Sequence, residues 1–102
     1  MEARKTVWVT GASGFVGRRL CARLQAQGMR VVAIGRSETS GPWEKFVRHE
    51  FGSGAFAVGE RPQAVFHLAA RTHALAETPG ERETYFKTNV EGMKELLGAL
   101  EG

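Results

Sequence analysis

The sequence contains no aspartate, a single cysteine and only three histidines. The lack of aspartate excludes an EF-hand calcium loop and an acidic dyad built on aspartate. Cys21 has no partner for an internal disulfide, and its place in an amphipathic stretch predicts a small core residue rather than a nucleophile. His49, His67 and His73 lack the i, i+4 spacing that favours zinc binding, so no metal site is predicted.

Long apolar runs are also absent. No stretch approaches the roughly 20 residues that a membrane span requires, and the apolar segment near the start is too short for a signal peptide. We therefore expect a cytoplasmic protein with no membrane segment. The 14 Lys and Arg residues exceed the acids by three and are scattered along the chain, which favours a small anionic ligand over a nucleic acid as partner.

The chain is short, with 102 residues. A chain of this size buries roughly 60 to 70% of the surface that it exposes when unfolded, which is enough for one core but not for a separate substrate domain. Residues 1–102 are therefore expected to form a single domain.

Short apolar stretches alternate with segments of helical periodicity. Strands are predicted at residues 6–10, 31–34, 46–51 and 64–68. One helix is predicted between the first two strands, closed by Gly28, and another over residues 82–100. Strands joined by crossovers predict an α/β fold with a parallel sheet.

Both predicted helices are amphipathic. On the first, the core face is expected to hold Phe15, Val16, Leu20, Cys21 and Leu24. On the second, it is expected to hold Phe86, Val90, Met93, Leu96, Leu97 and Leu100. Its outer face is expected to hold Glu91, Lys94, Glu95 and Glu101.

The strongest site signal lies where the first strand meets the first helix, in residues 10–17 (TGASGFVG). Gly11 permits a tight turn, Gly14 lets the backbone approach a pyrophosphate, and Gly17 lets helix and strand pack closely. The helix N-terminus then offers N–H groups to the anion, which makes Ser13, Phe15 and Val16 further candidates. The alternative is that these are turn glycines alone.

Cofactor preference is expected to be set after the second strand, at Arg36 and Ser37. A guanidinium with a neighbouring hydroxyl suits the 2′-phosphate of NADP(H), whereas NAD(H) enzymes place an acid there. NADP(H) is therefore favoured and NAD(H) is the alternative, in which Arg36 is a solvated loop residue or stacks on adenine.

Three motifs carry a resemblance to a known family: residues 10–17, residues 65–70 (VFHLAA) and Asn89-Val90-Glu91-Gly92 followed by two leucines. In them the chain resembles the amino-terminal portion of the extended short-chain dehydrogenase/reductase family, which includes NAD(P)-dependent nucleotide-sugar epimerases, dehydratases and ketoreductases. The resemblance implies a partial Rossmann fold: a short parallel sheet of about four strands, ordered 3-2-1-4, with flanking helices.

The resemblance also implies roles for single residues. Leu68, Ala69 and Ala70 would line the cofactor, and Asn89 would anchor the last helix near the nicotinamide. Family members place an Asp-Leu pair after the third strand, where the acid contacts the adenine amino group. The nearest match here is Glu50-Phe51, so Glu50 is the candidate for that contact.

The catalytic signature of the family is missing. Its chemistry depends on a Tyr-x-x-x-Lys pair, but the only tyrosine, Tyr85, is followed four residues later by Asn89. No catalytic residue is therefore predicted, and the chain alone is expected to be inactive. It is either the dinucleotide-binding amino-terminal part of such an enzyme, or a stand-alone, non-catalytic module that binds dinucleotide or protein. Self-association is expected through the strand at 64–68 or the last helix.

Overall fold

The computed structural model describes residues 4–69, 83 and 87–101 of the chain, and the structural statements below concern these residues. Their elements are β1 (Thr6–Thr10), α1 (Phe15–Ala26), β2 (Arg30–Gly35), β3 (Lys45–Arg48), β4 (Ala64–His67), a π-helical turn (Lys87–Glu91) and α3 (Gly92–Glu101). Among them, no helix has the length and apolar character needed to cross a membrane.

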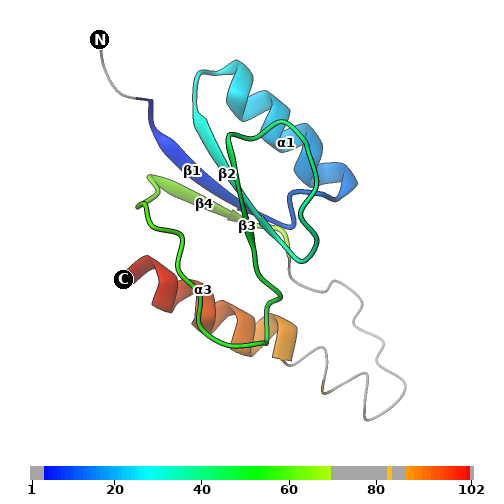
Figure 1. The fold of residues 1–102 in the computed structure, drawn as a ribbon, viewed down its shortest axis with the longest axis vertical. Helices are drawn as coiled ribbons and strands as arrows, with labels where there is room; N and C mark the ends of the chain where they lie inside the picture. The colour runs from blue at the N-terminus through cyan, green and yellow to red at the C-terminus, as the bar shows by residue number, and fades with distance from the viewer. Residues whose placement is uncertain (1–3, 70–82, 84–86, 102) are drawn as a thin grey trace.

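The four strands form one parallel sheet in the order β3-β2-β1-β4, as predicted (Figure 1). Successive residues of β1 face opposite sides of the sheet. Val7 and Val9 pack with Cys21 and Leu24 of α1, whereas Trp8 packs with residues from the side of α3. The sheet is thus the middle of three layers, and the prediction of a Rossmann-type α/β fold is confirmed.

Cys21 lies fully buried in the layer between α1 and the sheet. Burial raises the pKa of its thiol to about 11. Because the thiolate is the reactive form, this cysteine is a packing residue, as its sequence context predicted.

The prediction of a third strand over 46–51 is wrong at its end. β3 stops at Arg48, and the N–H of His49 still donates to the carbonyl of Gly35 at 2.8 Å. The chain then turns, because the N–H of Ser53 donates back to the carbonyl of Glu50 at 3.1 Å. Glu50 and Phe51 consequently follow the strand instead of belonging to it.

The buried face of α1 is rotated from the one predicted. Gly17, Cys21 and Leu24 are buried, whereas Phe15 and Val16 are 74% and 64% exposed. The reason is Gly17, which has no side chain and therefore lets this face of the helix touch the backbone of Gly11 and Ala12. Phe15 and Val16 are then directed away from the sheet.

The helix α3 also differs from its prediction. Leu96 is buried, as expected, but Met93 and Leu97 are exposed, and so is Val90 in the π-helical turn that precedes α3. Glu95, expected on the outer face, has a side chain that is only 11% exposed. The difference arises because the chain following β3 packs along α3 and contacts Glu95. Phe86 lies outside the described residues.

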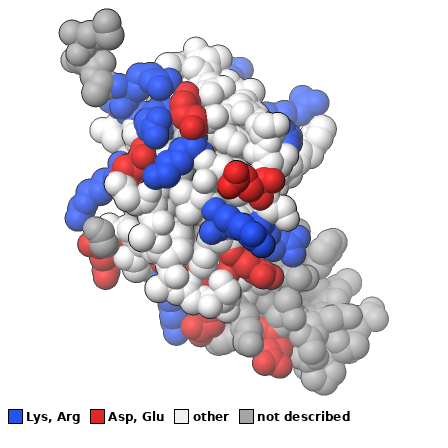
Figure 2. Space-filling model, in the orientation of Figure 1, with Lys and Arg blue, Asp and Glu red and all other residues white. Residues whose placement is uncertain are grey.

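The basic residues on the face shown in Figure 2 lie in several groups with glutamates between them. Some arginines of the fold are paired with glutamates: Arg4 bonds to Glu44 at 2.9 Å, and Arg30 bonds to Glu60 at 2.8 Å. The hydrogen bond from Arg30 lowers the pKa of Glu60. Part of the positive charge of the chain is therefore neutralised by ion pairs within the fold.

Candidate dinucleotide site

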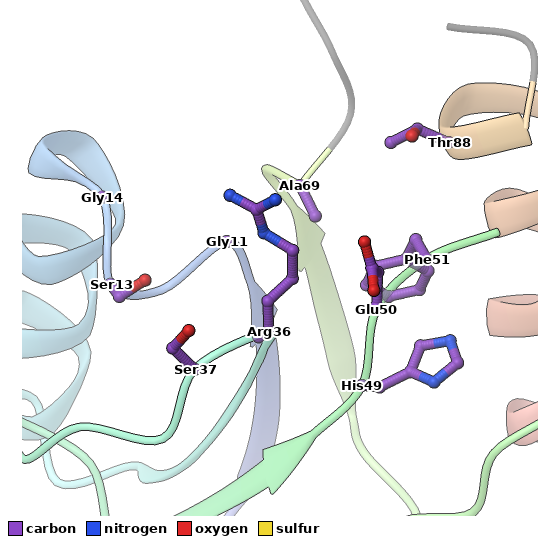
Figure 3. Close-up of a pocket in the computed structure, with 11 residues that line it drawn as sticks. Gly11, Ser13, Gly14, Arg36, Ser37, His49, Glu50, Phe51, Ala69 and Thr88 are labelled. Atoms are coloured by element: carbon purple, nitrogen blue, oxygen red, sulfur yellow. The ribbon is translucent and has the colours of Figure 1, made fainter. Parts of the chain in front are cut away.

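A cavity of about 500 Å³ opens at the carboxyl ends of β1, β2 and β4 (Figure 3). Ligands of open α/β sheets bind at this edge, near the point where the strand order reverses, which here lies between β1 and β4. Residues from five separate parts of the chain line the cavity: Gly11, Ser13, Gly14, Gly35, Arg36, Ser37, His49, Glu50, Phe51, Ala69 and Thr88.

Two glycines of the turn after β1 are required by packing. Gly11 has φ +67°, and a Cβ there would lie 2.8 Å from the backbone of Leu68. A Cβ on Gly17 would overlap the carbonyl oxygen of Gly11 and lie 2.7 Å from the Cα of Ala12. These glycines let the turn, α1 and the end of β4 approach one another.

Gly14 differs from both. Its φ of −73° and ψ of 171° suit any residue, and a Cβ there would meet only the carbonyl oxygen of Gly11, at an ordinary 3.5 Å. Neither conformation nor packing requires glycine at this position. What the missing side chain does provide is room on the cavity side for a ligand to approach the backbone.

The N-terminus of α1 is suited to an anion. Gly14 is the N-cap, no side chain caps the helix, and its first turn holds no acid. The first N–H groups of a helix have no partners within it and carry the positive end of the helix dipole. With the Ser13 hydroxyl beside them, these donors fit a pyrophosphate.

Arg36 and Ser37 follow directly on β2 at the cavity wall. Arg36 is exposed, and its guanidinium extends over the cavity (Figure 3). The carbonyl oxygen of Arg36 accepts a bond from Nε of Arg48 at 3.2 Å. The backbone at this position is thus held by the neighbouring strand, while the side chain faces the space in which a ligand would lie.

The opposite wall consists of His49, Glu50 and Phe51. The Glu50 carboxylate faces the cavity (Figure 3), whereas His49 and Phe51 are buried. The His49 ring stacks on Phe56 at 4.1 Å between centroids and meets Phe51 edge-on at 4.9 Å. This wall is aromatic and apolar apart from the Glu50 carboxylate. Such a surface suits a nucleobase that carries an amino group, because the ring can pack on the wall and the carboxylate can accept the amino N–H.

A buried hydroxyl fixes the chain beyond β4. Thr10 Oγ1 accepts the N–H of Ala69 at 3.1 Å and lies 2.7 Å from Nδ1 of His67. Burial lowers the pKa of His67, so the ring is neutral at pH 7. Within the described residues its Nε2 has no partner.

The cavity brings together seven of the residues expected from the sequence: Gly11, Ser13, Gly14, Arg36, Ser37, Glu50 and Ala69. The others lie elsewhere. Gly17 is buried between α1 and the turn, the side chains of Phe15 and Val16 point to solvent, and Leu68 and Asn89 each adjoin a lining residue. Ala70 lies outside the described residues. The roles of all of them stay predictions.

Sequence reasoning missed four lining residues as cofactor contacts: Gly35, His49, Phe51 and Thr88. Each of them is a direct neighbour of a predicted residue. For Gly35, His49 and Phe51 the signal that could have found them is position, because the segments at the carboxyl ends of β2 and β3 each contribute three consecutive residues to the cavity.

The sequence profile of the NAD dependent epimerase/dehydratase family matches residues 7–101. The chain belongs to this family. The resemblance to short-chain dehydrogenases/reductases is thereby confirmed.

Among curated proteins, this epimerase/dehydratase family chain is similar to the 2-alkyl-3-oxoalkanoate reductase of Shewanella oneidensis, with 29% identity over 104 residues. That match covers 90% of this chain and 24% of the relative. This chain therefore spans about a quarter of the length of that curated relative.

Two solved structures resemble it as well. A short-chain dehydrogenase/reductase superfamily protein from Agrobacterium tumefaciens, solved with bound NAD, has 32% identity and a TM-score of 0.71, over 93% of this chain and 28% of that one. The protein MoeE5, solved with UDP-glucuronic acid and NAD, has 29% identity and a TM-score of 0.72, over 92% and 32%.

Proposed function

We propose that this chain binds NADP(H) and forms the dinucleotide-binding part of a nucleotide-sugar epimerase, dehydratase or ketoreductase. The observation that carries the proposal is Gly14, a glycine that neither its conformation nor its packing demands, at an uncapped helix N-terminus facing the cavity. The NAD held by the two structural relatives supports the same class of ligand.

The residues of this chain would bind and orient the cofactor. None of them is assigned the transfer of the substrate's proton. The Gly-rich turn would bind the pyrophosphate, Arg36 and Ser37 the adenosine ribose with its 2′-phosphate, and Glu50 the base. When bound, the nicotinamide supplies hydride transfer. The Tyr-x-x-x-Lys pair that would move the proton does not occur among the 102 residues.

A nucleotide sugar is proposed as the substrate class because MoeE5 was solved with UDP-glucuronic acid. We also propose a cytoplasmic location, which the lone buried thiol of Cys21 favours because secreted domains of this size commonly depend on disulfides.

Arg36→Ala is expected to weaken NADPH binding roughly ten- to hundredfold and to leave NADH binding unchanged, because a charge-assisted bond to the 2′-phosphate contributes roughly 1.5 to 3 kcal/mol. Titration of the chain with each cofactor by fluorescence measures this. The matched control is Arg23→Ala, an exposed arginine in the last turn of α1. The NADP(H) proposal fails if Arg36→Ala binds NADPH as tightly as the wild type while NADH binds equally well to both.

Self-association through β4 or α3 is proposed as well. Within the described residues β4 pairs with β1 alone, so its outer edge offers free backbone groups. The exposed Met93 and Leu97 of α3, with Val90 of the π-helical turn before it, add apolar surface. Light scattering at increasing concentration should show dimers or larger species. A constant monomeric mass at the highest concentration would contradict the proposal.

A further inference from the structure

A carboxylate on α3 is bonded to the loop that follows β3. Glu95 Oε1 lies 2.9 Å from Nε2 of His49 and accepts the N–H of Gly52 at 3.0 Å, while Oε2 accepts the N–H of Gly54 at 2.9 Å. A solvated glutamate on a helix surface makes no such set of contacts. This carboxylate is therefore an internal partner of the loop 49–54.

The loop backbone is shaped around that carboxylate. Gly52 and Gly54 have φ values of 99° and 130°, which glycine adopts freely and other residues rarely do. These conformations turn both N–H groups toward the Glu95 oxygens. Paired backbone donors of this kind form a small anion-binding concavity, here filled by the protein's own side chain.

Phe51 attaches the same loop to α3 a second time. A Cβ on Gly92 would lie 2.8 Å from the Cβ of Phe51, so the missing side chain at Gly92 lets the helix approach the ring. Phe51 is buried with Trp8 and Leu96. Glu50 thus stands between two anchored neighbours, His49 and Phe51, while its own side chain is exposed and faces the cavity.

We propose that Glu95 is a positioning residue for the base of the dinucleotide, an inference that rests on the proposed function. By holding the loop 49–54 on α3, it fixes the place from which Glu50 presents its carboxylate. A carboxylate held there accepts a bond from the 6-amino group of adenine and repels the 6-oxygen of hypoxanthine. Glu95 therefore contributes to the choice of base without touching it.

The test compares NADPH with its hypoxanthine analogue, which carries oxygen in place of the 6-amino group. The wild type is expected to prefer NADPH about tenfold. Glu95→Gln should lose most of this preference, because an amide has one acceptor oxygen and its NH₂ cannot accept an N–H. Glu50→Ala should lose it too, and the double variant should lose no more than Glu50→Ala.

The matched control is Glu101→Gln, the same change on an exposed residue of the same helix, which should keep the full preference. Gly54→Ala is a milder second variant, since a Cβ there meets no atom within 4 Å and only the backbone conformation is strained. It should lose part of the preference. General destabilisation would weaken both ligands equally and leave their ratio unchanged.

A ratio that stays at the wild-type value in Glu95→Gln and Gly54→Ala overturns the role of Glu95 while leaving dinucleotide binding intact. A wild type that binds both ligands equally overturns it as well. Binding of neither ligand by the wild type contradicts the proposed function itself. In the ligand-free chain, Glu95→Gln should also speed amide hydrogen exchange at Gly52 and Gly54, and unchanged exchange would count against the inference independently of any cofactor.

Discussion

Gly17→Ala is expected to destabilise the fold by about 3 kcal/mol, at the upper end of the cost of overpacking. The added methyl would overlap the carbonyl oxygen of Gly11 and crowd the Cα of Ala12. Both are backbone atoms, so no side-chain rotation relieves the clash, and α1 has to move away from the turn. Urea unfolding measures the loss, and NADPH affinity should fall with it because the helix N-terminus is displaced.

Gly98→Ala provides the matched control. Gly98 is a helical glycine with no atom within 4 Å of an added Cβ, so the same substitution is expected to stabilise the chain by about 0.5 to 1 kcal/mol through helix propensity. Equal effects of the two substitutions would show that the turn does not require close contact with α1.

Thr10→Val should cost about 2 kcal/mol. Valine has nearly the shape of threonine, so the fully buried site is filled as before. The N–H of Ala69 and the Nδ1 atom of His67, however, both lose their partner, and a polar group left unpaired in a buried place costs roughly 1 to 3 kcal/mol. The loss is read from the midpoint of urea unfolding at pH 7 with an unchanged slope.

Thr6→Val is the control for this change, since Thr6 lies half-buried at the start of the same strand. Its effect should stay within about 0.5 kcal/mol. Stability of Thr10→Val equal to that of the wild type would mean that the hydroxyl does not hold the chain beyond β4.

The features that sequence alone predicted are those set by local pattern. The apolar run Val31–Ile34 reads as a strand covered on both faces, and all four residues are buried. The Gly-rich turn was found because the spacing of its glycines is a local pattern, although the contact that requires Gly11 is with the distant Leu68. The strand order β3-β2-β1-β4 was implied by the family resemblance rather than by any local pattern.

The features that sequence did not predict depend on contacts between distant segments. Glu95 occupies a position that helical periodicity assigns to solvent, and only the packing of the loop 49–54 makes it an interior residue. The apolar side chains of Phe15 and Val16 predicted that their face of α1 meets the sheet. Gly17, which has no side chain and so adds nothing to a hydrophobic pattern, instead determines which face is buried.

The attachment of Gly11 has a consequence for the thermodynamics of binding. Its N–H donates to the carbonyl of Ile34 at 3.0 Å, and the N–H of Leu68 donates to the carbonyl of Thr10 at 3.2 Å, so the turn is tied to the strands on both sides. A phosphate-binding backbone that already has its bound shape loses little conformational entropy when the ligand arrives. The entropic cost of association then falls mainly on the ligand's own torsions and on the long side chain of Arg36.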